Sequence, residues 1–166
     1  MKYIFFLSGD YIELGKEEGV LGDEERKILH RIFEFGDTQV GDVMTPKEKI
    51  VSTDVNTPGD KLLDLVTEEG HSYLPVFEGE RDHIFGVLYA RDLLYLWRSH
   101  ELIVVRDLIH QAHTVGPNER VIDLLRDFQR KGIRVAIVID PKGNAQGLVT
   151  LEDLTEEIVG EIPEPS

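Results

Sequence analysis

The sequence predicts an α/β fold in which one unit of helices and strands is written twice. Segments with the helical period alternate with short apolar runs typical of strands. Two phrases, GVLYARDLL from Gly86 and GLVTLEDLT from Gly147, repeat the same order of glycine, apolar strand and acidic helix start. Because a unit this small buries only a modest part of its surface, we expect the two sheets to pack face to face and share a core.

The composition of the 166 residues argues against several classes of protein. A net charge of -14 disfavours nucleic acid as a partner, since binding to phosphates needs a basic face. The absence of cysteine excludes disulfides, thiolate zinc sites and a cysteine nucleophile. The apolar run YIFFL (Tyr3–Leu7) is too short for a membrane helix or a usual signal peptide. We therefore expect a soluble protein.

The elements of the first unit follow in order from helix and strand signals. The segment GDEERKILHRIFEFG predicts an amphipathic helix that begins with acidic residues and ends at Gly36. A second helix is expected with Thr57 as its cap, Pro58 in its first position and Gly70 past its end. YLPVF and HIFGVLY predict two strands, and ARDLLYLW predicts a closing helix.

The second unit repeats this order. NERVIDLLRDFQRKG predicts a helix with Asn118 as cap and Gly132 as its end, VAIVI and QGLVT predict two strands, and LEDLTEEIVGEI predicts a closing helix. Upstream, VGDVM and VRDLI also align. The predicted parts are therefore an N-terminal segment with a lead-in helix (1–39), a first repeat (40–98) and a second repeat (105–162). Clefts between such repeats are common ligand sites.

The corner between strand and helix in the second phrase allows two interpretations. Thr150 and Asp153 have the spacing of a capping box, which needs no ligand. A carboxylate at such a corner can also accept hydrogen bonds from the two neighbouring hydroxyls of a ribose. In the first phrase Tyr89 stands in place of the threonine while Asp92 is retained, which capping alone explains less well. The residues leave both interpretations open.

The motifs, taken in order, resemble a known family. VMTP opens the first repeat, HSYLPV lies in its strand, GLVTLEDLTEEIVGEI closes the second repeat, and EEGVLGDEERKILHRIFEFGDTQVGDVMTP leads in. Together they resemble the tandem cystathionine-β-synthase-type (CBS) domain pair, or Bateman module, of the CorC/hemolysin C-like magnesium and cobalt transport proteins. The resemblance implies two βαββα-type repeats related by a pseudo-twofold axis, preceded by a helix.

The same resemblance implies a function. It predicts a regulatory module that binds an adenosine nucleotide, AMP or ATP, and that forms a homodimer. It also predicts a cytoplasmic location, as the cytosolic portion of an inner-membrane protein whose membrane domain this chain does not contain. No reaction is expected. The alternatives are a dimerisation or docking module that binds no nucleotide, and a small nucleotide-hydrolysing enzyme.

The resemblance further implies the residues of two clefts. In the cleft of the second repeat, Asp153 is expected on the ribose, Thr150 beside the phosphates and Arg134 at phosphate or base. The other residues expected in this cleft are Ile133, Val135, Leu148, Thr45, Pro46 and Ser72. The residues expected in the cleft of the first repeat are Asp92, Arg91, His71, Val87, Ile109 and His110. The second-repeat cleft is favoured, because Tyr73 and Tyr89 depart from the arginine and the threonine or serine frequent in the family.

The last predicted helix carries an acidic run beside the expected phosphates. Glu152 and Glu156 lie in this run. Because carboxylates repel phosphates unless a cation lies between them, we expect magnesium to accompany the nucleotide near these two residues. A solvated helix face is the alternative.

Overall fold

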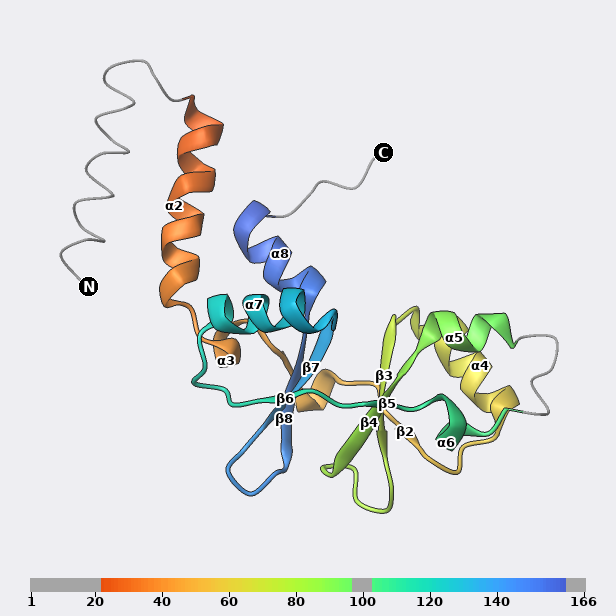
Figure 1. Cartoon of the computed structure of the whole chain (residues 1–166). Coiled ribbons are helices and arrows are strands. Elements are labelled where there is room, and N and C mark those ends of the chain that lie inside the picture. The colour runs from red at the N-terminus through yellow and green to blue at the C-terminus, as the bar shows by residue number, and fades with distance from the viewer. Residues whose placement is uncertain (1–21, 97–102, 161–166) are drawn as a thin grey trace.

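The computed structural model describes residues 22–96 and 103–160 of the chain. Two small α/β units lie side by side, and the helix α2 (Asp23–Asp37) rises from one of them next to the last helix, α8 (Leu151–Val159) (Figure 1). Residues 1–21, 97–102 and 161–166 lie outside the described residues. The prediction for the YIFFL run falls there. The two closing helices end at Tyr95 and Val159, before the predicted Trp97 and Ile162.

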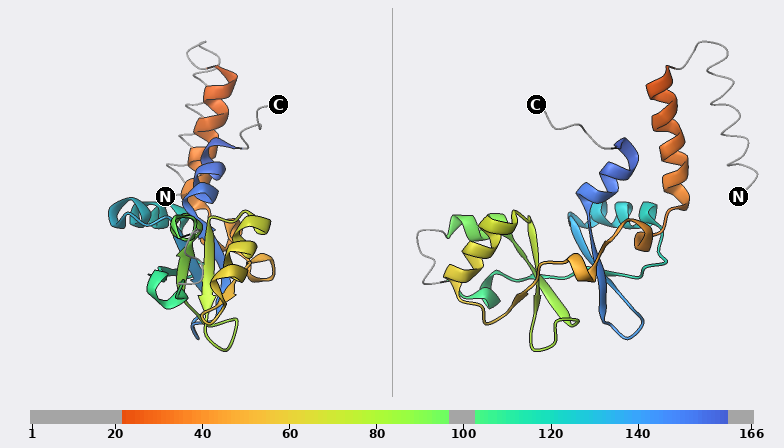
Figure 2. Two further views of the ribbon diagram at one scale, coloured as in Figure 1. Left: turned by 90° about the vertical axis from the view of Figure 1, so that its right-hand side faces the viewer. Right: turned by 180° about the vertical axis from the view of Figure 1, so that it is seen from behind.

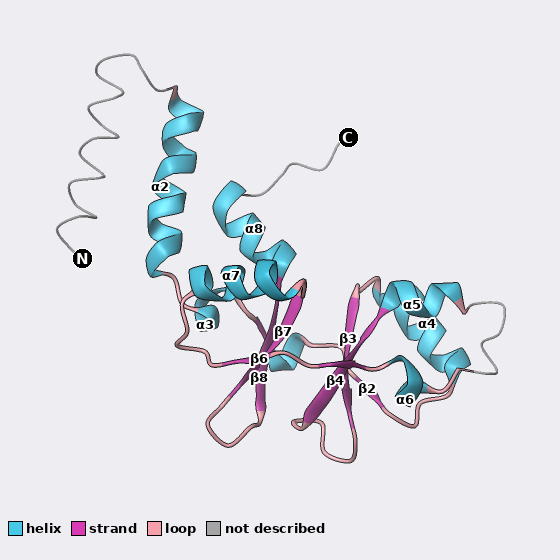
Figure 3. Ribbon diagram, viewed as in Figure 1, coloured by secondary structure: helices cyan, strands magenta, loops and turns pink. Residues whose placement is uncertain are grey.

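The two repeats have the same order of α-helices and strands, and the first has an additional 3-10 helix; this order confirms the predicted α/β fold (Figure 3). The first repeat contains α3 (Val40–Val43), β1 (Thr45–Pro46), the 3-10 helix η1 (Lys47–Lys49), β2 (Thr53–Asp54), α4 (Gly59–Glu69), β3 (Tyr73–Phe77), β4 (Ile84–Tyr89) and α5 (Ala90–Tyr95). The second contains α6 (Val105–Leu108), β5 (His110–Gln111), β6 (Thr114–Val115), α7 (Val121–Lys131), β7 (Val135–Ile139), β8 (Ala145–Thr150) and α8.

The two sheets exchange their edge strands. One sheet has the order β2-β3-β4-β5 and the other β1-β8-β7-β6. The strand β1 at the start of the first repeat therefore pairs with β8 of the second, and β5 pairs with β4 of the first. We call the unit built on β2-β3-β4-β5 the first half and the unit built on β1-β8-β7-β6 the second half. The exchange brings residues of each repeat into the opposite half.

The glycine that opens each repeated phrase is required by this exchange. A Cβ atom on Gly147 would lie 2.8 Å from the carbonyl oxygen of Thr45 in β1. A Cβ atom on Gly86 would lie 3.0 Å from the carbonyl oxygen of His110 in β5. A side chain at either position would push the exchanged strand away. Both sheets receive such a strand, which is part of the reason why the sequence repeats the phrase.

Hydrophobic clusters fill each half and the space between the sheets. In the first half the buried stripe of α4, formed by Leu62, Leu63 and Val66, packs against the sheet. In the second half Phe128 of α7 is 1% exposed, and Phe35 of α2 joins the same cluster. The cluster between the sheets contains Val87, Val135, Ile137 and Ala145. The sheets therefore meet face to face and share a core, as the repeat predicts, and Figure 2 shows the two halves from two further sides.

Two of the predicted helix ends are found where the sequence placed them. Gly70 and Gly132 follow α4 and α7 with φ angles of 67° and 66°. This left-handed conformation suits a residue without a Cβ atom. Pro58 precedes the first helical residue of α4 rather than occupying it, one position from the prediction.

Two other predicted helix ends are wrong. The helix α2 continues through Gly36 and ends at Asp37, and α7 begins at Val121 with Arg120, not Asn118, as its N-cap. An isolated β-bridge pairs Gln39 with Arg120. This tertiary contact holds both segments extended, and it overrides the local signals of the glycine and the asparagine.

Candidate functional site

A cavity of about 280 Å³ lies between the two halves. Its walls come from β1 and the segment after it, from the end of α4 and the start of β3, and from the corner between β8 and α8. The lining residues are Thr45, Lys49, Ile50, Val51, Gly70, His71, Ser72, Tyr73, Pro75, Leu148, Thr150, Glu152 and Asp153. The edge-strand exchange carries Thr45 into the second half, where it is paired with Leu148 across the sheet.

The corner between β8 and α8 forms a complete capping box. The backbone N–H of Thr150 donates to Oδ2 of Asp153 over 2.7 Å, and the backbone N–H of Asp153 donates to Oγ1 of Thr150 over 3.1 Å. Within the described part of the chain, Oδ1 of Asp153 receives no hydrogen bond from the protein. Asp153 therefore caps its helix with one oxygen, and its side chain also lines the cavity.

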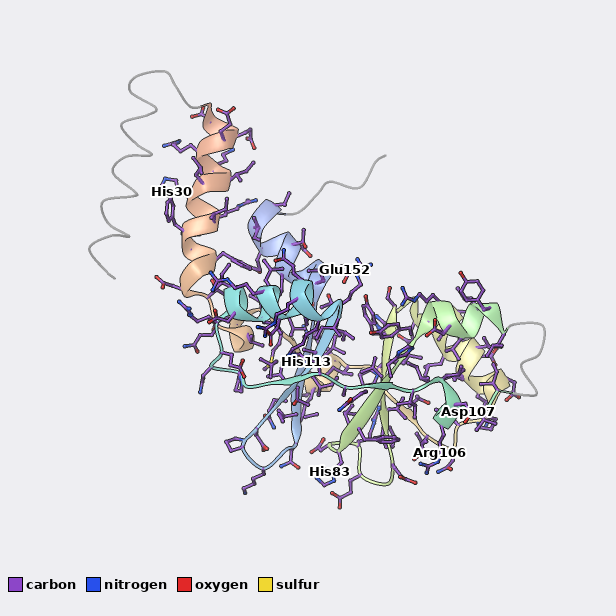
Figure 4. All side chains as sticks on the ribbon, in the orientation of Figure 1. His30, His83, Arg106, Asp107, His113 and Glu152 are labelled. Carbon is purple, nitrogen blue, oxygen red and sulfur yellow. The ribbon has the colours of Figure 1, made fainter. Side chains whose placement is uncertain are left out.

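The lining of the cavity contains charges of both signs. Glu152 and Asp153 come from the start of α8, and Lys49 comes from η1. Arg134 forms an ion pair with Glu152 over 3.1 Å, and both side chains are about half exposed (Figure 4 labels Glu152). Burial raises the pKa of the Tyr73 hydroxyl, and the carboxylate of Glu152 adds to this effect. The phenol therefore stays protonated and can donate a hydrogen bond into the cavity.

Apolar side chains provide the remaining walls. Ile50, Val51, Pro75 and Leu148 line the cavity. Binding sites for small organic ligands commonly combine such walls with a few polar groups that fix orientation. The arrangement suits a ligand with a flat apolar part, hydroxyl groups and an anionic part.

The structure brings together part of the set predicted for the second-repeat cleft. The residues of that set in the lining are Thr45, Ser72, Leu148, Thr150 and Asp153. The residues outside the lining are Pro46, Ile133, Arg134 and Val135. Val135 is 4% exposed and belongs to the cluster between the sheets, and Ile133 packs against the core of the second half. Arg134 is held by its contact with Glu152.

Sequence reasoning missed several lining residues. These are Lys49, Ile50, Val51, Gly70, Tyr73 and Pro75, while His71 was expected in the other cleft. Of the residues at the start of β3, only Ser72 was predicted for this cavity. No local pattern in the sequence shows which half a segment will face. The repeat contained a signal that could have found them. Residues 70–73 of the first repeat correspond to residues 132–135 of the second. In a pseudo-twofold pair two corresponding segments cannot both face the same corner.

Of the residues predicted for the first-repeat cleft, Asp92, Arg91 and His110 gather around the ring of Tyr89. His110 Nε2 lies 2.7 Å from Asp92 Oδ2, and the imidazole stacks on the Tyr89 ring with centroids 4.3 Å apart. The guanidinium carbon of Arg91 lies 5.0 Å from the centroid of the same ring. Val87 is 2% exposed in the cluster between the sheets, and Ile109 packs on the core of the first half.

The two candidate magnesium contacts lie in different settings. Glu152 lines the cavity, whereas Glu156 is exposed one turn further along α8 and outside the lining. In residues 22–96 and 103–160, no group of three or more His, Cys, Asp or Glu side chains is placed to hold a metal ion. The helices of this part of the chain are all too short or too polar to cross a membrane.

Comparison with known proteins gives consistent matches. The family model of the CBS domain matches residues 40–98 and 105–160. The magnesium and cobalt efflux protein CorC of Escherichia coli (strain K12) is 36% identical over 147 residues, which are 88% of this chain and 50% of that protein. The chain therefore spans about half the length of the curated relatives it matches.

Solved structures resemble the fold closely. The CBS domain of a bacterial CNNM/CorC family Mg²⁺ transporter is 36% identical with a TM-score of 0.87, over 93% of this chain and 94% of that one. A structure of such a domain in complex with ATP is 38% identical with a TM-score of 0.78, over 83% and 99%. A CBS-domain pair from Klebsiella pneumoniae with bound AMP is 28% identical with a TM-score of 0.66, over 74% and 99%.

The family match covers both repeats, and the relatives share their order and fold. The chain belongs to the CBS domain family, as a tandem pair homologous to the one in the CorC magnesium and cobalt efflux proteins.

Proposed function

We propose that this chain binds an adenosine nucleotide, AMP or ATP, in the cavity beside Asp153 and acts as a regulatory module of a CorC-like transport protein. The observation that carries the proposal is the capping-box corner of Thr150 and Asp153, both of which line a cavity between two CBS repeats. Two similar structures support the ligand class, since one contains ATP and the other AMP.

The proposed orientation of the nucleotide follows from the chemistry of the walls. Ribose hydroxyls donate to Oδ1 of Asp153, and each such charge-assisted bond is worth about 1.5 to 3 kcal/mol. The phosphates lie near Thr150 and the start of α8, where the helix dipole favours an anion. The base lies against the apolar side chains of Ile50, Val51 and Leu148.

Magnesium is proposed to accompany a polyphosphate ligand. Glu152 lines the cavity and brings a second carboxylate close to the expected phosphates. Carboxylate and phosphate oxygens are ligands that Mg²⁺ prefers, and the ion cancels their mutual repulsion. Glu156 lies further out and is proposed to act through a water molecule of the ion's shell. AMP, with one phosphate, is then expected to depend less on magnesium than ATP.

Regulation requires that the nucleotide favour one arrangement of the module over another. A ligand shifts such an equilibrium only by the difference between its affinities for the two states. The cavity supports this role because both halves contribute walls to it, so a bound nucleotide is sensitive to their relative position. Transport itself is assigned to a membrane domain outside this chain, and the module to the cytosolic side of an inner membrane.

A homodimer is part of the proposal. On α5 the adjacent side chains of Leu94 and Tyr95 are 59% and 88% exposed. Neighbouring exposed apolar side chains often mark a surface that another protein covers. Sedimentation analysis should give a dimer that Tyr95→Glu converts to a monomer, and a wild-type chain that stays monomeric at high concentration contradicts this part.

Titration calorimetry with AMP, ADP and ATP, each with and without magnesium, tests the nucleotide proposal. We expect saturable binding of at least one nucleotide, with ATP binding strengthened by magnesium. No saturable binding by any of the three favours the alternative, a dimerisation or docking module without nucleotide. Phosphate release from ATP in proportion to protein, abolished in Asp153→Ala, makes the chain an enzyme and overturns the regulatory assignment.

A further inference from the structure

A second cavity, of about 230 Å³, lies beside η1 and shares a wall with the cavity at Asp153. Lys47 and Glu48 of η1 line the second cavity, whereas Lys49 lines the first. Ile50, which follows η1, lines both. The second cavity is therefore a neighbour of the proposed nucleotide site and has charged groups of its own.

The second cavity forms where the loop between β3 and β4 meets η1 and the start of β8. The two hairpin loops of the molecule lie at the same end of the two halves (Figure 1). The carbonyl oxygen of Asp82, in the β3–β4 loop, accepts the backbone N–H of Ala145 over 2.8 Å. Oδ2 of Asp82 lies 3.1 Å from Nζ of Lys47. These contacts hold the loop of the first half against η1 and β8, and they fix the walls of the cavity.

Two charged side chains remain at this cavity once Lys47 and Asp82 have paired. Arg81 comes from the β3–β4 loop, and Glu48 comes from η1. In the part of the chain that the structure describes, neither side chain has a hydrogen bond or an ion pair with the protein. The cavity therefore offers a ligand one cation and one anion.

Apolar walls and a small volume limit what this cavity can hold. Ile50 and Ile84 are partly buried in its lining, and Ala145 is 4% exposed. Its volume is below the roughly 300 to 1,000 Å³ of sites for drug-sized ligands. At about 30 Å³ for each water-sized group, it holds about eight non-hydrogen atoms. An aliphatic α-amino acid such as valine has this size and combines an ammonium, a carboxylate and an apolar side chain.

We propose that this second cavity binds a free aliphatic α-amino acid. The carboxylate of the ligand accepts hydrogen bonds from the guanidinium of Arg81, a group whose planar fork matches a carboxylate. The ammonium donates to the carboxylate of Glu48, and the hydroxyl of Ser52, also in the lining, bonds to either charged group. The aliphatic side chain packs against Ile50 and Ile84. The inference goes beyond the proposed function, because its ligand and its charged contacts are separate from those of the nucleotide.

Calorimetric titration of the whole chain with valine and with leucine tests this inference. We expect saturable binding that isovalerate, which lacks the ammonium, and isobutylamine, which lacks the carboxylate, do not reproduce. Arg81→Gln and Glu48→Gln should each weaken binding by at least about tenfold, because each removes one charge-assisted contact. The matched control is Glu80→Gln, in the same loop but outside the lining, where the native side chain is 83% exposed. This control should leave the affinity unchanged.

Amide spectra recorded during the titration locate the ligand. Valine should shift the signals of Ser52, Ile84 and Ala145, and shifts confined to Thr150 and Asp153 overturn the inference by placing the ligand in the first cavity. The inference is also overturned if neither amino acid binds, if the two analogues bind as well as valine, or if both glutamine variants keep native affinity. None of these results bears on the nucleotide titrations, so the failure of this inference and the failure of the proposed function are distinguishable.

Discussion

Replacing Asp153 by asparagine separates the two roles of this side chain. The asparagine oxygen can still accept the backbone N–H of Thr150, which lies 2.7 Å from Oδ2 in the native protein. The negative charge is lost, and the second carboxylate oxygen becomes an NH₂ group that cannot accept a ribose hydroxyl. Losing one or two charge-assisted hydrogen bonds should cost about 2 to 4 kcal/mol of binding, or roughly 30- to 1,000-fold in affinity.

The stability of the fold should change much less. Complete loss of a helix cap costs about 0.5 to 2 kcal/mol, and Asp153→Asn keeps the capping acceptor. We therefore expect a fall of under about 1 kcal/mol in the free energy of unfolding. Thr150→Ala gives the converse result, because it removes the hydroxyl that accepts the Asp153 N–H and should cost about 1 kcal/mol of stability.

Calorimetric titration with MgATP and urea unfolding of the same samples measure both quantities. The matched control is Asp92→Asn, the same change at the equivalent corner, where His110 already holds the carboxylate. This control should leave nucleotide affinity unchanged. Native affinity in a folded Asp153→Asn protein, or an equal loss in the Asp92→Asn control, would refute the assignment of the ribose to Asp153.

Three further predictions concern the frame around the site. Gly147→Ala places a Cβ atom 2.8 Å from a carbonyl oxygen of β1. In urea unfolding this change should lower the free energy of unfolding by about 1 to 3 kcal/mol. The control Gly36→Ala, which has open space around it, should not lower it. Arg31→Ala removes a 2.6 Å hydrogen bond to the carbonyl of Val159, and amide exchange in α2 should increase. An unchanged exchange rate would show that this bond does not hold α2 against α8. Burial lowers the pKa of His113 below 6.5. As the pH drops below 6.5 the unfolded chain protonates this histidine before the folded chain does, so the free energy of unfolding should fall. A His113→Gln protein whose stability has the same pH slope would contradict this assignment to His113.

The local pattern was sufficient for the elements of the fold. Strands β3 and β7 lie where the apolar runs YLPVF and VAIVI predicted them, and Gly70 and Gly132 end their helices. These features depend on residues close in the sequence, such as a glycine that adopts a positive φ angle. Where a distant segment intervened, as in the bridge between Gln39 and Arg120, the predicted helix ends were wrong.

The composition of the site was only partly predictable. The capping spacing drew attention to Thr150 and Asp153, and the structure places both at the cavity. Lys49 and Val51 carry no such spacing, and they reach the cavity because their segment follows the exchanged strand β1. The contact between His110 and Asp92 depends in the same way on β5 crossing to the first half.

The sequence by itself determined the repeat, its strands and helices, and the acidic corner of each copy, because turn chemistry and hydrophobic period act over a few residues. Only the tertiary structure decided which half each edge strand joins, and therefore which distant side chains meet at the corners that hold Asp92 and Asp153. The physical reason is that strand pairing and the packing of two sheets join residues far apart in the chain, and local preferences do not select among such partners.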